Sequence, residues 1–342
     1  MIPAMPLADL HTIVVGRDAM GCRFEVAFNA GEVPEATELG IAALDLIDEI
    51  EARLSIYRDS SELAAVNRAA GEWVAVSTDT FELLSLARNL HARTAGGFDI
   101  VAGSLVRAWG FLDRQGRTPT EAELATARSV SGTRLLELDA ATGRVRLAAM
   151  GAELNPGGIG KGWAIDRGCD LLAAAGVPSM LVHGGQSSVR ARGVHGPDLP
   201  DRTGWKVGLR HPLRPGRRLA TITLADRALG TSGSGTQFFI ERGRRLGHIL
   251  DPRTGRPATT SLSATVLAAT AAEADALATA LYVLGRPGLA RIAPAGGSAG
   301  GILVEPAGGG LRVVVANLDR ATVAIEPEPG LAVEWLAEAA RE

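Results

Sequence analysis

The sequence has few cysteines and no long apolar run. Only two of its 342 residues are cysteines, Cys22 and Cys169, and they stand far apart in the chain. A disulfide framework needs more cysteines and a zinc ribbon needs Cys-x-x-Cys pairs, so the sequence favours neither. No stretch of 18 uninterrupted apolar residues occurs. We therefore expect no membrane span.

Basic residues are not in excess, and lysine is rare. Lys plus Arg total 35 against 38 for Asp plus Glu, which gives a formal net charge of -3. Binding to nucleic-acid phosphates normally requires a basic surplus, so we expect no nucleic-acid partner. Lys161 and Lys206 are the only lysines. The N-terminal segment lacks the basic region and apolar stretch of a signal peptide, and the expected location is the cytoplasm.

The composition is that of a globular protein, with 46% hydrophobic and 21% charged residues. Apolar residues at helical spacing predict helices over 34–54, 80–93, 162–175 and 271–284. Alternating or apolar runs predict strands over 12–15, 22–28, 134–138, 144–148, 179–182, 187–191, 205–210, 219–224, 236–241, 246–250 and 263–268. Because strands and helices do not alternate regularly, the sequence favours an α+β fold with mainly antiparallel strands. No Pro/Ser linker divides the chain, so residues 1–342 are expected to form a single unit.

The densest motif is Asn-Pro-Gly-Gly-Ile-Gly-Lys-Gly at 155–162, which leads into an expected helix. Its glycines let the backbone approach a ligand closely, and a helix N-terminus beside Lys161 suits a phosphate or pyrophosphate. It is not a Walker A loop, because Asn155 and Gly162 stand where that pattern needs Gly and Ser or Thr. A structural glycine turn without a ligand is the alternative.

A second cluster, His-Ile-Leu-Asp-Pro-Arg-Thr-Gly, occupies residues 248–255. An expected strand carries His248 into a tight Asp-Pro turn. An imidazole there could act as a general base near neutral pH, with Asp251 orienting it or holding a cation. A plain turn that places a histidine at a strand end is the alternative.

The third cluster lies on the helix expected over 271–284. Asp275 and Thr279 are four residues apart, so they share one face of an otherwise apolar Ala/Leu helix. Two oxygen ligands one turn apart suit Mg²⁺, which completes its shell with phosphates and water. A solvated polar stripe is the alternative. Residues 231–235, Thr-Ser-Gly-Ser-Gly, do not meet the G-x-S-x-G pattern and predict a turn that donates hydroxyls to a ligand.

These motifs, in this order, resemble the ApbE family of FAD:protein FMN transferases. The similarity extends from about residue 20 to residue 317. Its segments are Met-Gly-Cys at 20–22, residues 54–63 with 67–71, residues 94–110 and 155–162, Thr-Ser-Gly at 231–233, residues 248–255 and residues 274–279. The resemblance implies two interlocked T-fold-like halves with mainly antiparallel sheets and packed helices. It also implies Mg²⁺-dependent transfer of FMN from FAD to a Thr or Ser hydroxyl of a target flavoprotein, with release of AMP.

The resemblance further implies a set of site residues. Asp275 and Thr279 are expected to bind Mg²⁺, together with the main-chain carbonyl of Gly160, and His248 is expected to be the catalytic base. The residues expected to contact FAD are Met20, Tyr57, Gly97, Phe98, Asp99, Asn155, Lys161 and Leu250. The expected partners are FAD and an acceptor protein that carries a Thr/Ser flavinylation motif.

Four positions depart from the family pattern. Cys22 stands where the family has Thr, Asn155 where it usually has Asp, Gly160 where it usually has Ala, and Gln186 where it has an acidic residue. Two other functions stay open beside FMN transfer. One is an FAD pyrophosphatase that produces FMN and AMP, and the other is an FAD-binding protein without turnover.

Overall fold

The computed structural model describes residues 12–196, 204–214, 216–233, 237–294 and 296–336. The centre of the described part is a nine-stranded sheet, antiparallel except for its last pair. In spatial order its strands are β1 (Thr12–Ala19), β2 (Cys22–Asn29), β6 (Met180–Gly184), β7 (Ser188–Arg192), β10 (Arg227–Gly233), β15 (Ser263–Ala268), β16 (Gly300–Ala307), β17 (Gly310–Ala316) and β19 (Leu331–Trp335).

The sheet consists of two halves with the same plan. In each half two strands precede a helical segment and two strands follow it: β1, β2, β6 and β7 first, then β10, β15, β16 and β17. The first segment includes α1 (Ala36–Leu54) and α6 (Gly160–Ala174), and the second is α7 (Ala271–Leu284) with α8 (Arg286–Ile292). The α+β class with antiparallel strands is confirmed, and the repeated plan agrees with two T-fold-like halves.

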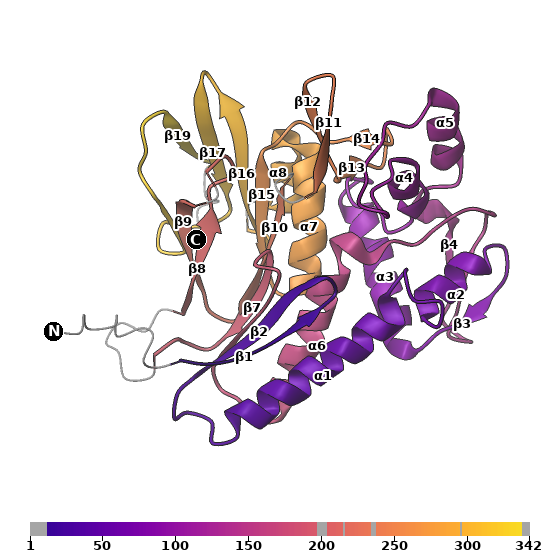
Figure 1. Cartoon of the computed structure of the whole chain (residues 1–342). Coiled ribbons are helices and arrows are strands. Elements are labelled where there is room, and N and C mark those ends of the chain that lie inside the picture. The colour runs from indigo at the N-terminus through magenta and orange to yellow at the C-terminus, as the bar shows by residue number, and fades with distance from the viewer. Residues whose placement is uncertain (1–11, 197–203, 215, 234–236, 295, 337–342) are drawn as a thin grey trace.

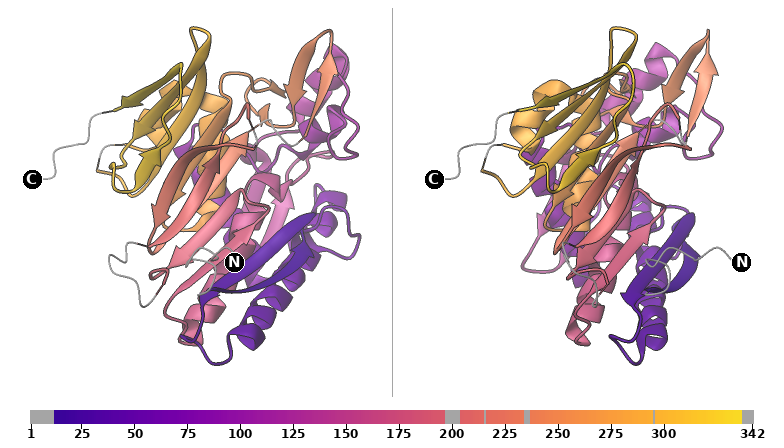
Figure 2. Two further views of the ribbon diagram at one scale, coloured as in Figure 1. Left: turned by 60° about the vertical axis from the view of Figure 1, so that its left-hand side comes forward. Right: turned by 90° about the vertical axis from the view of Figure 1, so that its left-hand side faces the viewer.

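Both faces of the large sheet are covered. Helices α1, α6 and α7 lie side by side on one face (Figures 1 and 2). A three-stranded sheet, β18 (Val323–Ile325), β9 (Arg218–Leu224) and β8 (Trp205–Arg210), covers part of the other. In β15, Val266 packs in the helix-side core and Leu267 in the core beneath β8 and β9. A strand buried on both faces carries a continuous apolar run, as 263–268 does.

Helix α7 is buried along almost its whole length. Thr270 caps its start by accepting a hydrogen bond from the N–H of Glu273, and it ends at Gly285, whose φ of +63° an L side chain rarely adopts. It contacts β10 and β15 on one side and α6 and α3 (Thr78–Arg93) on others. A helix surrounded in this way is largely apolar, and on it Asp275 is buried while Glu273 and Thr279 are half-buried.

The remaining elements form a smaller lobe beside the sheet, at the right and top of Figure 1. They are α2 (Glu62–Arg68), α3, α4 (Gly103–Ala108), α5 (Glu121–Ser129), the strands β3 (Val74–Ala75), β4 (Leu136–Asp139) and β5 (Arg144–Leu147), and the hairpins β11 (Phe238–Glu241) with β12 (Arg244–Gly247) and β13 (Leu250–Asp251) with β14 (Arg256–Pro257). None of the described helices combines the length and apolar character needed to cross a bilayer.

The four predicted helices are confirmed with small shifts in their ends. Helix α6 begins at Gly160 rather than at residue 162, which places Lys161 in its first turn. The strand predicted over 246–250 is wrong, because β12 ends at Gly247 and β13 begins at Leu250. The turn predicted at 231–235 is wrong for Thr231–Gly233, which end β10. Ser234, Gly235 and Thr236 lie outside the described residues.

Candidate active site

A cleft of about 810 Å³ opens between the smaller lobe and the end of the large sheet nearest to it. Ten of the twelve predicted site residues line it, namely Tyr57, Gly97, Phe98, Asp99, Asn155, Lys161, His248, Leu250, Asp275 and Thr279. Gly160 and Met20 are not among its lining residues. Met20 forms the two-residue turn between β1 and β2 with Gly21, at φ of +50° and +71°.

Asp275 is a buried carboxylate at the floor of the cleft. Its side chain accepts a hydrogen bond of 2.9 Å from the main-chain N–H of Gly162 in the first turn of α6. Burial raises the pKa of Asp275 to about 6, while Lys161, Ser188 and the Gly162 N–H act in the opposite direction. Only 8% of the residue is exposed, so the solvated stripe that was the alternative is wrong. The N-terminus of α6 holds this carboxylate as it would hold an anionic ligand.

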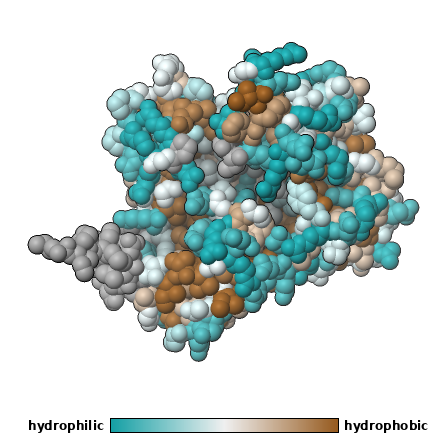
Figure 3. Space-filling view, viewed as in Figure 1, coloured by the Kyte–Doolittle hydropathy of each residue, from teal (hydrophilic) through white to brown (hydrophobic). Residues whose placement is uncertain are grey.

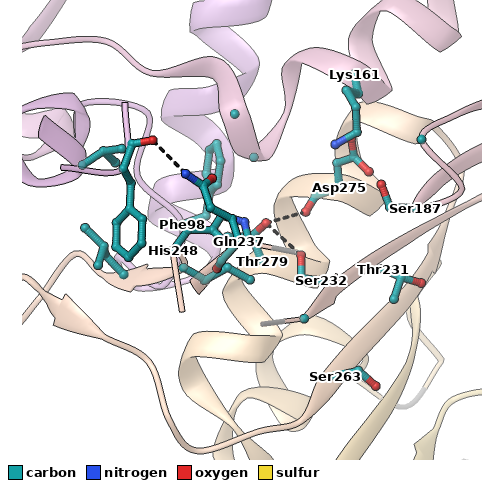
Figure 4. Close-up of a pocket in the computed structure, with 18 of the residues that line it drawn as sticks. Phe98, Lys161, Ser187, Thr231, Ser232, Gln237, His248, Ser263, Asp275 and Thr279 are labelled. Atoms are coloured by element: carbon teal, nitrogen blue, oxygen red, sulfur yellow. Dashed lines mark hydrogen bonds between the residues drawn. The ribbon is translucent and has the colours of Figure 1, made fainter. Parts of the chain in front are cut away.

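Thr279 presents its hydroxyl to the same floor, one helical turn after Asp275. Its Oγ1 donates to the main-chain oxygen of Asp275 at 3.1 Å and lies 3.1 Å from Oγ of Ser232 on β10 (Figure 4). The end of β10 thus brings a second hydroxyl to the helix. Helix α7 therefore contributes a carboxylate and a hydroxyl to the cleft floor, and β10 contributes a second hydroxyl.

The glycine-rich segment forms one wall of the cleft. Asn155 caps a short 3₁₀ turn, Pro156–Gly158, by accepting from the N–H of Gly157 at 2.9 Å. A Cβ at Gly158 would lie 3.3 Å from both Oγ1 of Thr279 and the Phe98 ring, so glycine permits this close approach. Lys161 follows and lies next to Asp275 (Figure 4). The segment therefore lines the cleft with main chain and one positive charge.

His248 lies between β12 and β13, on the opposite wall. Its Nδ1 is 3.0 Å from the carbonyl oxygen of Gln237. A carbonyl only accepts, so Nδ1 carries the proton and Nε2 of the neutral ring is left as an acceptor. Burial lowers the pKa of His248, and Lys161 lowers it further, against the opposing effect of the Gln237 hydrogen bond. The imidazole is neutral at pH 7 and able to take a proton at Nε2.

The proposed role of Asp251 beside His248 is wrong. Both carboxylate oxygens of Asp251 bind Arg253, at 2.8 Å each, and Oδ1 also accepts from the Arg253 main-chain N–H. The Asp251 carboxylate thus binds a residue of its own loop and not His248. The carbonyl of Gln237, eleven residues earlier in the chain, orients the imidazole instead.

Asp99 lines the cleft, but its carboxylate is held by the protein. It accepts from the Val101 N–H and from the N–H and hydroxyl of Thr133, and it lies 3.2 Å from His91 Nδ1. Burial alone would raise the pKa of Asp99, but the hydrogen bonds from His91 and Thr133 outweigh it and the pKa is lowered. This network fixes the backbone of the Gly97–Phe98 segment at the cleft wall.

The donors at the cleft floor fit Mg²⁺ and no larger metal cluster. In the part of the chain that the structure describes, no three His, Cys, Asp or Glu side chains come together to hold a metal. Mg²⁺ is usually bound by one or two carboxylates plus substrate phosphates and water. The buried Asp275 supplies one carboxylate, its raised pKa reflects a charge that lacks solvent, and Thr279 and Ser232 add hydroxyls.

The sequence interpretation did not assign Gln237 or Arg210 to the site, and it noted Gln186 only as a departure from the family pattern. All three residues line the cleft, and Arg210 donates to the side chain of Gln186. Ser232 also lines the cleft, and its segment was predicted to offer hydroxyls to a ligand, but as a turn rather than as the strand that carries it to Thr279. Gln237 acts through its main chain, which leaves no trace in side-chain patterns.

Comparisons with known proteins agree on one family. The model of the ApbE family matches residues 20–299. A Vibrio cholerae protein named FAD:protein FMN transferase is 33% identical over 245 residues, covering 70% of this chain and 71% of the relative. A Treponema pallidum protein of the same name is 34% identical over 268 residues, covering 75% and 73%.

Solved structures show the same fold. The ApbE protein of Thermotoga maritima superimposes with a TM-score of 0.78 at 27% identity, covering 86% of this chain and 94% of that protein. The flavin transferase ApbE of Vibrio cholerae gives a TM-score of 0.76 at 26% identity, covering 89% and 97%.

Proposed function

The chain belongs to the ApbE family, and we infer from this that it is an FAD:protein FMN transferase, like the relatives that carry that name. We propose that the reaction needs Mg²⁺, joins FMN to a Thr or Ser hydroxyl of the acceptor and releases AMP. The observation that carries this proposal is the placement of an imidazole with a free Nε2 and a buried carboxylate beside a lysine in one cleft.

The residues divide the chemistry between the two walls. The acceptor hydroxyl oxygen attacks the FMN-side phosphorus of FAD, and its proton passes to Nε2 of His248. The bond from that phosphorus to the bridging oxygen breaks, and AMP leaves with the electron pair. Lys161 supplies positive charge to the pyrophosphate, and the glycine segment lets the main chain approach it. Tyr57, Phe98 and Leu250 are proposed to contact the flavin or adenosine parts.

Mg²⁺ is proposed to be held by Asp275, Thr279 and the carbonyl of Gly160. When bound, it supplies positive charge that neutralises the pyrophosphate as the leaving group departs. Asp275 supports this assignment because its pKa stays raised by burial even with Lys161 beside it, and a bound cation would stabilise the charged carboxylate further. Asn155 caps its own turn through Oδ1, so we do not assign it to the metal.

The test is incubation of the purified protein with FAD, Mg²⁺ and a co-expressed flavoprotein acceptor from the same genome. We expect AMP in solution and one FMN mass added to a Thr- or Ser-containing peptide, detected by mass spectrometry. Free FMN with AMP and no adduct would instead indicate a pyrophosphatase. Absence of AMP with either water or acceptor would indicate an FAD-binding protein without turnover. The single-unit organisation of residues 1–342 and the cytoplasmic location stay predictions.

A further inference from the structure

We propose that the exposed face of the β11–β12 hairpin is the docking surface for the acceptor protein, and that it binds an extended segment with acidic and apolar side chains. The docking face is formed by Phe238, Ile240 and Arg245, with Arg242 in the turn at its tip. This inference rests on the proposed function, because only a protein acceptor needs such a surface.

One face of the hairpin fixes it to the smaller lobe. Phe239 lies with its ring 5.8 Å from that of Phe111 and 6.4 Å from that of Trp109. Its cross-strand partner Leu246 packs on the same cluster. A Cβ at Gly116 would lie 2.6 Å from the Phe239 ring, so the contact is tight. These contacts hold the hairpin against the smaller lobe through one face and leave its other face unused in this packing.

The other face is apolar and open. Side chains alternate across a strand, so Phe238 and Ile240 point away from Phe239. They are 43% and 69% exposed, and the space-filling view shows apolar atoms gathered over this hairpin at the top of the molecule (Figure 3). The guanidinium of Arg245 lies 3.7 Å above the Phe238 ring. Exposed apolar residues grouped beside a functional cleft are typical of a protein-binding surface.

The charges on the hairpin favour an acidic partner. Arg242, Arg244 and Arg245 are all exposed within four residues. The one acidic residue of the hairpin, Glu241, accepts a hydrogen bond from Thr118 of the smaller lobe. A positive edge with apolar side chains behind it matches a segment that carries both carboxylates and apolar groups.

The docking face leads directly to the reacting groups. Gln237, which orients His248, immediately precedes β11, and His248 immediately follows β12. In the described part of the chain these two strands pair only with each other, so their outer edges are open to another strand. A strand rises about 3.3 Å per residue, so Ile240 lies about 10 Å along β11 from Gln237. An extended segment seated on Ile240 would place a hydroxyl three residues away at His248.

The experiment measures FMN transfer to the acceptor that the wild-type enzyme flavinylates, and to a peptide of about 15 residues centred on its modified Thr or Ser. For Ile240→Ser we expect the KM for both acceptors to rise about 10-fold or more, because the variant loses the aliphatic contact that the bound acceptor would bury. For Arg242→Glu we expect a rise of about 3-fold at low salt that shrinks as salt is added. FAD affinity stays at the wild-type value in both.

Matched controls separate docking from other effects. Val14→Ser removes an exposed apolar residue from β1, where Val14 is 54% exposed, and Arg291→Glu reverses an exposed charge on α8; both keep the wild-type KM. A peptide with Asn and Gln in place of Asp and Glu should lose most of the salt dependence. Unchanged KM values in the hairpin variants would overturn the docking face while leaving the proposed function intact. No transfer by the wild-type enzyme would overturn both.

Discussion

The main-chain N–H of Gly162 donates a 2.9 Å hydrogen bond to the carboxylate of Asp275, and this bond joins the start of α6 to the middle of α7. The two helices touch through their backbones at the same place. A Cβ added to Gly162 would lie 2.2 Å from the carbonyl oxygen of Ala271. The position of Asp275 therefore depends on a residue with no side chain.

Gly162→Ala should separate α6 from α7. The added methyl group cannot fit against a backbone atom, so we expect a loss of about 2–4 kcal/mol in the free energy of unfolding, of the size seen for strained core substitutions. Transfer activity should fall further than stability alone explains, because Asp275 loses its hydrogen bond. Chemical denaturation and initial-rate measurements check the two effects.

Gly168→Ala is the matched control on the same helix. A Cβ at Gly168 would meet Ile47 at an ordinary 3.5 Å, and alanine favours a helix over glycine by about 0.5–1 kcal/mol. We expect equal or higher stability and unchanged transfer. Equal stability of the two variants would contradict the close backbone contact at Gly162.

Asp275→Asn should abolish the response of transfer to Mg²⁺. The amide oxygen can still accept from Gly162, but the negative charge is gone, and we expect kcat/KM to fall by about 10³-fold or more. In the absence of Mg²⁺ at pH 7 the variant should be more stable than the wild type, by about 1–3 kcal/mol, because the buried carboxylate is charged above its raised pKa of about 6.

Glu273→Gln removes a charge from the same helix without touching the cleft. Glu273 pairs with Arg93 at the start of α7. This control should keep both the Mg²⁺ response and the transfer rate. A wild-type Mg²⁺ titration curve for Asp275→Asn would remove Asp275 from the metal site.

His248→Ala should slow transfer by about 10²–10⁴-fold while FAD affinity changes little. Added imidazole should restore part of the rate, because it replaces the lost proton acceptor. In the wild type the active form of the base is neutral, so kcat/KM should fall only as the pH drops below the lowered pKa of His248. Transfer that stays at the wild-type rate in the variant would show that another group takes the proton.

The pair His91 and Asp99 should make stability depend on pH. The hydrogen bond to Asp99 is the main cause of the raised pKa of His91. The stability that protonated His91 contributes is therefore present below pH 6.5 and is lost as the pH rises through the raised pKa. The pKa of Asp99 is lowered, so its contribution is present above pH 3.8 and is lost as the pH falls.

His91→Gln should therefore lower the free energy of unfolding most between pH 3.8 and 6.5, and less above that range. Urea denaturation at several pH values measures the difference in the free energy of unfolding. In an Asp99→Asn background the same substitution should lose its pH dependence. A cost that is constant with pH would show that the two groups do not interact.

Apolar spacing was enough to locate the long elements of the fold. Helices α1 and α3 each bury one face, and α7 buries almost all of its surface, so their patterns repeat over several turns. Helices α2 and α8 have seven residues each and were not predicted. Fewer than two turns cannot establish a period. Strands β16 and β17 were not predicted either, although both are largely buried.

The site was predicted where chemistry lies in side chains and missed where it lies in the main chain. Asp275 and Thr279 stood out because they are polar within an apolar helix. Asp251 was chosen to orient His248 because the two are neighbours in sequence, yet the orienting atom is the Gln237 carbonyl. Contacts between residues far apart in the chain, such as Ser232 with Thr279, depend on strand placement that local patterns do not encode.

The repeated plan of the central sheet means that each half holds only part of the site. The first half supplies Lys161 and the glycine segment, the second supplies Asp275 and Thr279, and His248 comes from the hairpins inserted between β10 and β15 of the second half. A substitution that shifts one half against the other would misalign the bound nucleotide with the proposed catalytic base His248 without altering any residue that touches the nucleotide. Inactivating changes should therefore also arise along the seam between β7 and β10, away from the cleft itself.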